Sequence, residues 1–129
     1  MLFGKKKKIL FVDDDENIKA TTSFILESWG LDVLTAANGQ EALSLIRNED
    51  PDLVLLDINM PGIKGYDICK LAKSDPKTRK IPIILMTGLG KTKEVDQGYS
   101  CGADDYMIKP VDMDRLKSKI SSVLNIKIN

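Results

Sequence analysis

The sequence predicts an α/β fold, a doubly wound five-stranded parallel sheet with five helices divided between its two faces. Short, mostly apolar runs alternate five times with segments whose apolar residues recur at helical spacing. The clearest of these runs, 9–12 and 53–56, contain no polar residue, which is typical of strands buried on both faces. Strands that alternate with helices are joined by right-handed crossovers, so we expect all five strands to run parallel.

The first strand is predicted over 9–12, and it leads directly into Asp13-Asp14-Asp15-Glu16. The following helix is indicated by near-helical spacing of Ile18, Thr22, Ile25, Leu26 and Trp29. Gly30 fits the C-terminal cap of that helix, and residues 31–36 form the second strand. Asn38, with Glu41 three residues later, is typical of the start of a second helix.

The central strand is predicted over 53–56, between Pro51 and the turn signal Pro61-Gly62, with Asp57 where the strand leaves the core. A third helix carries Ile68, Leu71 and Ala72 and closes before Asp75-Pro76. The fourth strand, 81–86, ends at Thr87.

A weaker helix is expected over 92–101, where Gly98 costs about 1 kcal/mol relative to alanine. The last strand, 106–108, ends at Lys109-Pro110. Asp112 is placed to cap a final helix whose apolar face comprises Met113, Leu116, Ile120, Val123 and Leu124.

Length and charge favour a single domain over 1–129, with its core at about 8–124. Lysine plus arginine equals aspartate plus glutamate, at 19 each, which argues against direct binding of nucleic acid or of an anionic membrane. The apolar runs are too short to span a membrane, and the lysine-rich start lacks the features of a signal peptide. A cytoplasmic location is therefore expected.

The histidine and cysteine content of the chain excludes several kinds of catalytic and metal-binding site. The chain has no histidine, which excludes a Ser-His-Asp triad, a histidine-ligated zinc site and an internal histidine base. Cys69 and Cys101 lack metal-ligand spacing, so reduced thiols are expected, with a disulfide as the lesser alternative.

Chemically active side chains gather where the strands end: Asp13 and Asp14 after the first, Asp57 after the third, Thr87 after the fourth and Lys109 after the fifth. In a parallel sheet these positions share one edge, where ligands of open α/β folds bind. Crowded carboxylates repel one another unless a cation joins them, and oxygen-only ligands favour Mg²⁺. Asp57 is then left as a nucleophile that could form an aspartyl-phosphate, with Lys109 and Thr87 available to phosphoryl oxygens.

Structural alternatives exist for each residue taken alone. Asp15 and Glu16 are better explained as charges favoured at a helix N-terminus than as metal ligands. Asp57 and Thr87 could cap loops, and Lys109 could be a surface lysine. Their coincidence on the expected strand ends favours a shared function.

Four segments together resemble the receiver domain of two-component response regulators, a chemotaxis-regulator-like, flavodoxin-like family, across essentially all of 8–124. They are Val12-Asp13-Asp14, Leu56-Asp57-Ile58-Asn59-Met60-Pro61-Gly62, Met86-Thr87-Gly88, and residues 102–110, Gly-Ala-Asp-Asp-Tyr-Met-Ile-Lys-Pro. The resemblance implies the strand order 2-1-3-4-5.

The family implies a role for each matching residue. Asp57 would be the phosphoacceptor in a phosphorelay. Asp14, Asp57 and the backbone carbonyl of Asn59 would bind Mg²⁺, or Mn²⁺ as a substitute, with Asp13 acting mainly through a metal-bound water. Thr87 and Tyr106 match the paired switch residues, and the Lys109-Pro110 bond resembles a cis peptide of the family.

The resemblance also implies partners. A histidine kinase or histidine phosphotransfer protein would donate the phosphoryl group, because this chain has no histidine of its own. Phosphorylation would change the surface formed by the fourth helix, fifth strand and fifth helix, where a downstream protein target would bind. The domain would catalyse only its own phosphorylation and dephosphorylation.

Departures from the family pattern follow Thr87, where Gly88 replaces a common alanine and Leu89-Gly90 follows. Asn59 and Leu89 would flank the phosphoryl group, and since Leu89 cannot orient water, slow hydrolysis is expected. Gly90-Lys91-Thr92 resembles the end of a nucleotide-binding loop, but the first glycine of that motif would fall at Leu85, inside a strand.

Two rival functions remain open on the sequence. Aspartate-based phosphohydrolases usually have an aspartate two residues after the nucleophile, where this chain has Asn59. A receiver that signals without phosphorylation would not need the complete acidic and lysine set. The chain reaches Asn129 without room for a DNA-binding output domain, so a stand-alone regulator and a receiver excised from a longer protein are both compatible with it.

Overall fold

A computed structural model describes residues 6–60, 62–88 and 101–128 of the chain. Five parallel strands form one sheet in the order β2-β1-β3-β4-β5, which confirms the predicted fold class and the implied strand order. The strands are β1 (Lys8–Val12), β2 (Asp32–Ala36), β3 (Leu53–Asp57), β4 (Ile83–Gly88) and β5 (Asp105–Lys109).

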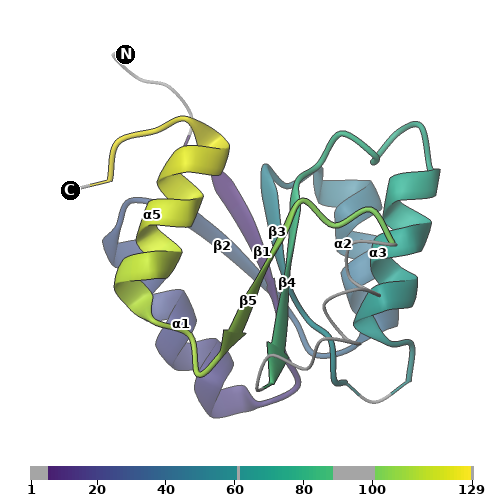
Figure 1. The fold of residues 1–129 in the computed structure, drawn as a ribbon, viewed down its shortest axis with the longest axis horizontal. Coiled ribbons are helices and arrows are strands. Elements are labelled where there is room, and N and C mark those ends of the chain that lie inside the picture. The colour runs from purple at the N-terminus through teal and green to yellow at the C-terminus, as the bar shows by residue number, and fades with distance from the viewer. Residues whose placement is uncertain (1–5, 61, 89–100, 129) are drawn as a thin grey trace.

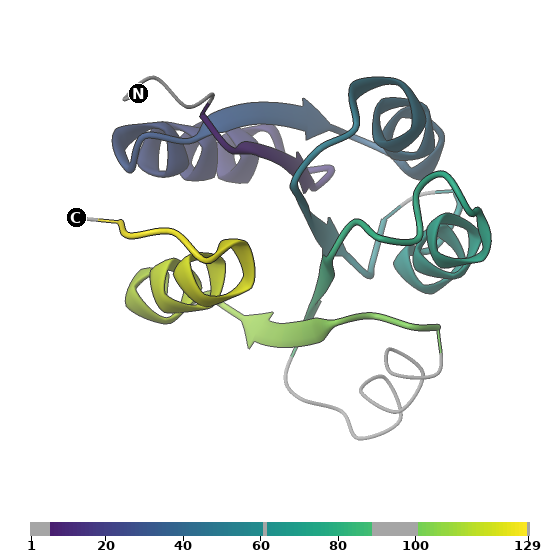
Figure 2. The same ribbon diagram turned by 90° about the horizontal axis from the view of Figure 1, so that it is seen from above.

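Helices cover both faces of this sheet (Figures 1 and 2). Helices α1 (Glu16–Ser28) and α5 (Met113–Leu124) lie on one face, and α2 (Gly39–Glu49) and α3 (Gly65–Ser74) lie on the other. The helix expected over 92–101 falls, apart from Cys101, outside the described residues and stays a prediction.

Alternating side chains of the central strands fill two cores. Leu10, Val12, Val54 and Leu56 belong to the core under α2 and α3, whereas Ile9, Phe11, Leu53 and Leu55 belong to the core under α1 and α5. Successive side chains of a strand point to opposite faces, so a strand covered on both sides must be apolar at every position. This explains the wholly apolar runs of β1 and β3.

The predicted helix caps are present. The Asp15 carboxylate accepts hydrogen bonds from the amides of Asn17 and Ile18, and the side-chain oxygen of Asn38 accepts one from the amide of Glu41. Asp112 caps α5 in the same way, and Gly30 has the positive φ of 85° that favours glycine after a helix. Asp15 therefore has the structural role that the sequence favoured.

Two of the apolar side chains whose spacing indicated these helices are largely exposed. Ile18 of α1 is 42% exposed and Leu71 of α3 is 45% exposed. Within α3 the buried positions are Gly65, Ile68, Cys69 and Ala72, so Leu71 falls beside the buried stripe and not on it. Within the described part of the chain, no helix has the length and apolar character needed to cross a membrane.

Candidate functional site

The sheet register brings the predicted site residues to one edge. Val12 pairs with Leu56 and Asp57 pairs with Met86, so Asp13 lies beside Asp57 and Thr87 follows on the neighbouring strand. Gly88 pairs with Lys109, which completes the set from β5. Helix α3 begins close behind Asp57, where a Cβ added to Gly65 would lie 2.8 Å from the Asp57 carbonyl oxygen.

Three carboxylates form the centre of the site. One oxygen each from Asp13, Asp14 and Asp57 lies within 4.8 Å of the others, with Asp13 and Asp57 buried and Asp14 exposed. Asp13 Oδ1 accepts a hydrogen bond of 2.9 Å from the Asp15 amide. Asp13 Oδ2 is buried and has no hydrogen-bond partner among the described residues.

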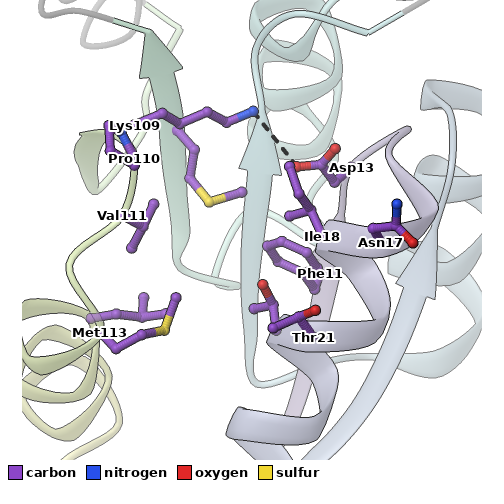
Figure 3. Close-up of a pocket in the computed structure, with 12 residues that line it drawn as sticks. Phe11, Asp13, Asn17, Ile18, Thr21, Lys109, Pro110, Val111 and Met113 are labelled. Carbon is purple, nitrogen blue, oxygen red and sulfur yellow. Dashed lines mark ion pairs between the residues drawn. The ribbon is translucent and has the colours of Figure 1, made fainter.

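Lys109 provides the positive charge. Its Nζ lies 2.7 Å from Asp57 Oδ2 and 3.6 Å from Asp13 Oδ2 (Figure 3 draws the contact with Asp13). The other Asp57 oxygen, Oδ1, accepts a 3.1 Å hydrogen bond from the Asn59 amide. The Lys109-Pro110 peptide bond is cis, as the family resemblance implied.

Burial and charge move the pKa values of the central pair. Burial disfavours the ionised carboxyl and raises the pKa of Asp57, and hydrogen bonds from Lys109 and Asn59 offset this only in part. Burial lowers the pKa of Lys109, but the carboxylates of Asp57 and Asp13 outweigh it, so the pKa of Lys109 is raised overall. The protein alone therefore favours the charged lysine more strongly than it favours the charged Asp57.

The oxygen set fits a hard divalent cation. Desolvating the Asp13 carboxylate while leaving Oδ2 without a hydrogen bond is costly, and a cation bound between Asp13, Asp14 and Asp57 would remove that cost. Carboxylate oxygens without nitrogen or sulfur ligands favour Mg²⁺ over zinc. The Asn59 backbone carbonyl remains a predicted ligand, on a residue whose amide already contacts Asp57.

The two predicted switch residues lie on neighbouring strands and on one face of the sheet. Leu85 pairs with Tyr106 in the register of β4 and β5, and Thr87 lies two residues beyond Leu85. Side chains two apart on a strand share a face, so Thr87 and Tyr106 both lie on the face covered by α2 and α3. Thr87 is buried, and Tyr106 is partly buried against the core on that face.

Of the two residues expected to tune the phosphoryl lifetime, the structure describes only Asn59. Asn59 is exposed and follows Asp57 by two positions. Leu89 lies outside the described residues, so its predicted place beside Asp57 is untested.

An apolar cavity of about 560 Å³ between α1 and α5 was missed by the sequence analysis (Figure 3). Asp13 and Lys109 line it together with Phe11, Asn17, Ile18, Thr21, Thr22, Met86, Pro110, Val111, Met113 and Leu116. Ile18 is partly exposed because it lines this cavity. The only hint of the cavity in the sequence is that the apolar Ile18 lies so close to the acidic residues 13–16.

The response regulator receiver domain family matches residues 9–121. The chain belongs to this family. It is a receiver domain of two-component signalling, and the carboxylates of Asp13, Asp14 and Asp57 form the acidic pocket of the fold.

Known proteins similar to this receiver domain fall into two groups. The first comprises longer regulators: a probable transcriptional regulator of Porphyra purpurea is 42% identical over 94% of this chain and 49% of its own length. A DNA-binding dual master transcriptional regulator of Synechocystis is 35% identical over 91% of the chain and 48% of its own length. The receiver domain thus spans about half the length of the curated relatives it matches.

The second group comprises solved structures of about the same size as this chain. A putative response regulator of Chloroflexus aurantiacus superposes with a TM-score of 0.89 at 34% identity, covering 94% of this chain and 99% of that one. The chemotaxis protein CheY4 of Vibrio cholerae gives 0.87 at 29% identity, covering 93% of this chain and all of that one.

Proposed function

We propose that this receiver domain is a phosphoryl-accepting switch in which Asp57 is the phosphoacceptor. The observation that carries the proposal is the arrangement of the buried Asp57 carboxylate at the end of β3. It contacts one cation, Lys109, at 2.7 Å and lies among the oxygens of Asp13 and Asp14. Its raised pKa and few partners distinguish it from a carboxylate that only caps a loop.

The donor would be a phosphohistidine on a histidine kinase or phosphotransfer protein. An Asp57 oxygen attacks phosphorus, the new P–O bond forms as the P–N bond breaks, and the electron pair returns to the donor's imidazole nitrogen. Mg²⁺, or Mn²⁺, held by Asp13, Asp14, Asp57 and the Asn59 carbonyl would neutralise charge on the transferring oxygens. Lys109, now bound to Asp57 Oδ2, is within reach of the same oxygens.

The response would travel through Thr87 and Tyr106. The Thr87 hydroxyl donates a long hydrogen bond of 3.5 Å to the Gly88 carbonyl and can turn toward a phosphoryl oxygen. Tyr106, on the same face of the sheet, would then move inward. Together they would change the surface of residues 92–101, β5 and α5, where a downstream protein binds.

The test is incubation with Mg²⁺ and a small acyl phosphate such as acetyl phosphate, followed by peptide mass mapping. We expect a phosphoryl mass gain on Asp57 that disappears in Asp57→Asn. Continuous turnover of phosphate esters without a trapped adduct would instead indicate a phosphohydrolase, and no gain at all would indicate signalling without phosphorylation. A labelled residue other than Asp57 in the Asp57→Asn variant would contradict the assignment.

A further inference from the structure

Two cysteines that are 32 residues apart in sequence meet between α3 and the segment that enters β5. The Cys69 thiol of α3 donates a hydrogen bond of 3.7 Å to the Cys101 carbonyl oxygen, and the two thiols are close enough to shift each other's pKa. Both are reduced and buried in the core under α2 and α3. Neither touches the acidic site, so their chemistry is independent of phosphoryl transfer.

The contact is held by its neighbours and does not depend on the thiols alone. Lys73, one turn after Cys69 on α3, forms an ion pair of 2.8 Å with Asp104. A Cβ added to Gly102 would lie 3.3 Å from the Lys73 side chain, so the chain beside Cys101 lies directly against this helix. The same stripe of α3 thus fixes both ends of the segment 101–104.

The two sulfurs are chemically unequal. The hydrogen bond from Cys69, together with the amides of Ala103 and Cys101 itself, outweighs burial and lowers the pKa of Cys101 to about 7. The pKa of Cys69 is raised, first by its interaction with Cys101 and then by burial. Cys101 is 8% exposed and Cys69 is fully buried, so Cys101 is the thiol that a small oxidant meets first.

We propose that Cys101 and Cys69 are a peroxide-reactive pair, in which Cys101 is oxidised first and Cys69 closes an intramolecular disulfide. The Cys101 thiolate attacks one oxygen of hydrogen peroxide, forming an S–O bond while the O–O bond breaks and hydroxide leaves. The Cys69 sulfur then attacks the sulfenic sulfur of Cys101, its proton passes to the departing hydroxyl, and water is released. The two thiols lose two electrons to one peroxide.

The disulfide would join α3 to the segment that leads into β5. Gly102, which packs against Lys73 of α3, lies four residues before Tyr106 in the sequence. Closing a loop of this length removes conformational freedom mainly from the unfolded chain. We therefore expect the melting temperature of the oxidised protein to rise by about 5–10 °C, and dithiothreitol to reverse the rise.

The test uses the full chain, reduced and freed of reductant, then exposed to hydrogen peroxide and finally alkylated in denaturant. We expect wild type to lose two hydrogen atoms, to resist alkylation and to remain monomeric on a non-reducing gel. In Cys69→Ala, oxidation should stop at a dimedone-reactive sulfenic acid on Cys101, whereas Cys101→Ser should leave Cys69 reduced. Site-resolved alkylation of native wild type should increase at Cys101 between pH 6 and 8.

Three results would overturn the proposal. They are wild-type thiols that both remain alkylatable after peroxide, intermolecular dimers as the only disulfide product, and equal oxidation of Cys69 in Cys101→Ser. Because the wild-type measurement requires no substitution, a variant that folds poorly does not affect this outcome.

Discussion

Two lysine–aspartate pairs lie at opposite ends of the strands, one at the amino ends (the amino edge of the sheet) and one at the carboxyl ends (the carboxyl edge). They differ in how completely they are hydrogen-bonded. At the amino edge, Lys73 Nζ donates to Asp104 Oδ2 at 2.8 Å and to the carbonyls of Ile81 and Arg79 at 2.7 and 3.2 Å. These use all three donors of the ammonium group. Asp104 Oδ2 also accepts the Ile83 amide at 2.8 Å, so this pair joins α3, β4 and β5 through backbone groups.

At the carboxyl edge, Lys109 and Asp57 are as close, at 2.7 Å, but have fewer partners. Among the described residues the Lys109 ammonium group pairs only with carboxylates, and the Asp57 side chain is buried whereas that of Asp104 is half exposed. The first pair is satisfied by the protein itself. The second leaves charge that an added cation or phosphoryl group can satisfy, which is the difference between a structural contact and a reactive one.

The largest expected effect separates the two lysines. Lys109→Ala should slow phosphorylation of Asp57 by about 100-fold, the usual loss when one charge-stabilising donor is removed from a transition state. Lys73→Ala should be phosphorylated at the wild-type rate while its free energy of unfolding falls by about 1 kcal/mol, because the partly buried Ile81 carbonyl loses a donor. Rates are measured with acetyl phosphate and Mg²⁺, and unfolding by urea titration. Equal phosphorylation rates for Lys109→Ala and wild type would remove Lys109 from the mechanism.

Stabilisation by Mg²⁺ should depend on carboxylates at the carboxyl edge and not on those at the amino edge. Mg²⁺ at ten times its dissociation constant should stabilise the native protein by about 1.4 kcal/mol, because it binds the folded state and not the unfolded chain. Asp14→Ala should remove most of this gain, since it deletes the exposed carboxylate of the cluster. Asp104→Ala is the matched control and should keep the full gain. An unchanged wild-type melting temperature in millimolar Mg²⁺ would contradict the site.

The acidic end of this contrast could be predicted from the sequence. The apolar runs indicated where β1 and β3 lie, and because the carboxyl ends of parallel strands meet at one edge of the sheet, Asp13 and Asp57 must lie close together there. The Lys73–Asp104 pair could not be found this way, because it joins residues 31 apart whose contact depends on how α3 packs. The same limit hid the cysteine contact and the cavity between α1 and α5. Helical spacing correctly predicted α1 and α3, but it did not show that the side chains of Ile18 and Leu71 would remain exposed.

The lifetime of the phosphorylated state gives a smaller effect at the carboxyl edge. Leu89, outside the described residues, follows Thr87 by two positions, and its side chain can neither donate nor accept a hydrogen bond. Glutamate there could orient an attacking water, so Leu89→Glu should speed loss of the phosphoryl group by up to about tenfold, or about 1.4 kcal/mol of barrier. Decay of phosphorylated Asp57 with Mg²⁺ and no partner measures it. An equal or slower rate in the variant would place Leu89 away from the site.

The smallest effect is one of sign, and it compares two matched substitutions without Mg²⁺. Asp104→Asn should lower the melting temperature by a few degrees, because its bond with Lys73 loses charge assistance, an effect reduced by the exposure of Asp104. Asp57→Asn should raise it by a few degrees, because burial and the nearby Asp13 carboxylate both disfavour the charged form of Asp57.

The pH dependence gives an independent check of that sign. Since the pKa of Asp57 is higher in the folded protein than in the unfolded chain, the folded state binds this proton more tightly. Ionised Asp57 therefore destabilises the folded protein above its folded pKa, and this destabilisation disappears as pH falls from the folded pKa toward the unfolded value of 3.8. The extra stability of Asp57→Asn over wild type should disappear over the same pH range. An advantage that grew with acidification would mean that Lys109 holds Asp57 ionised more strongly than burial opposes it.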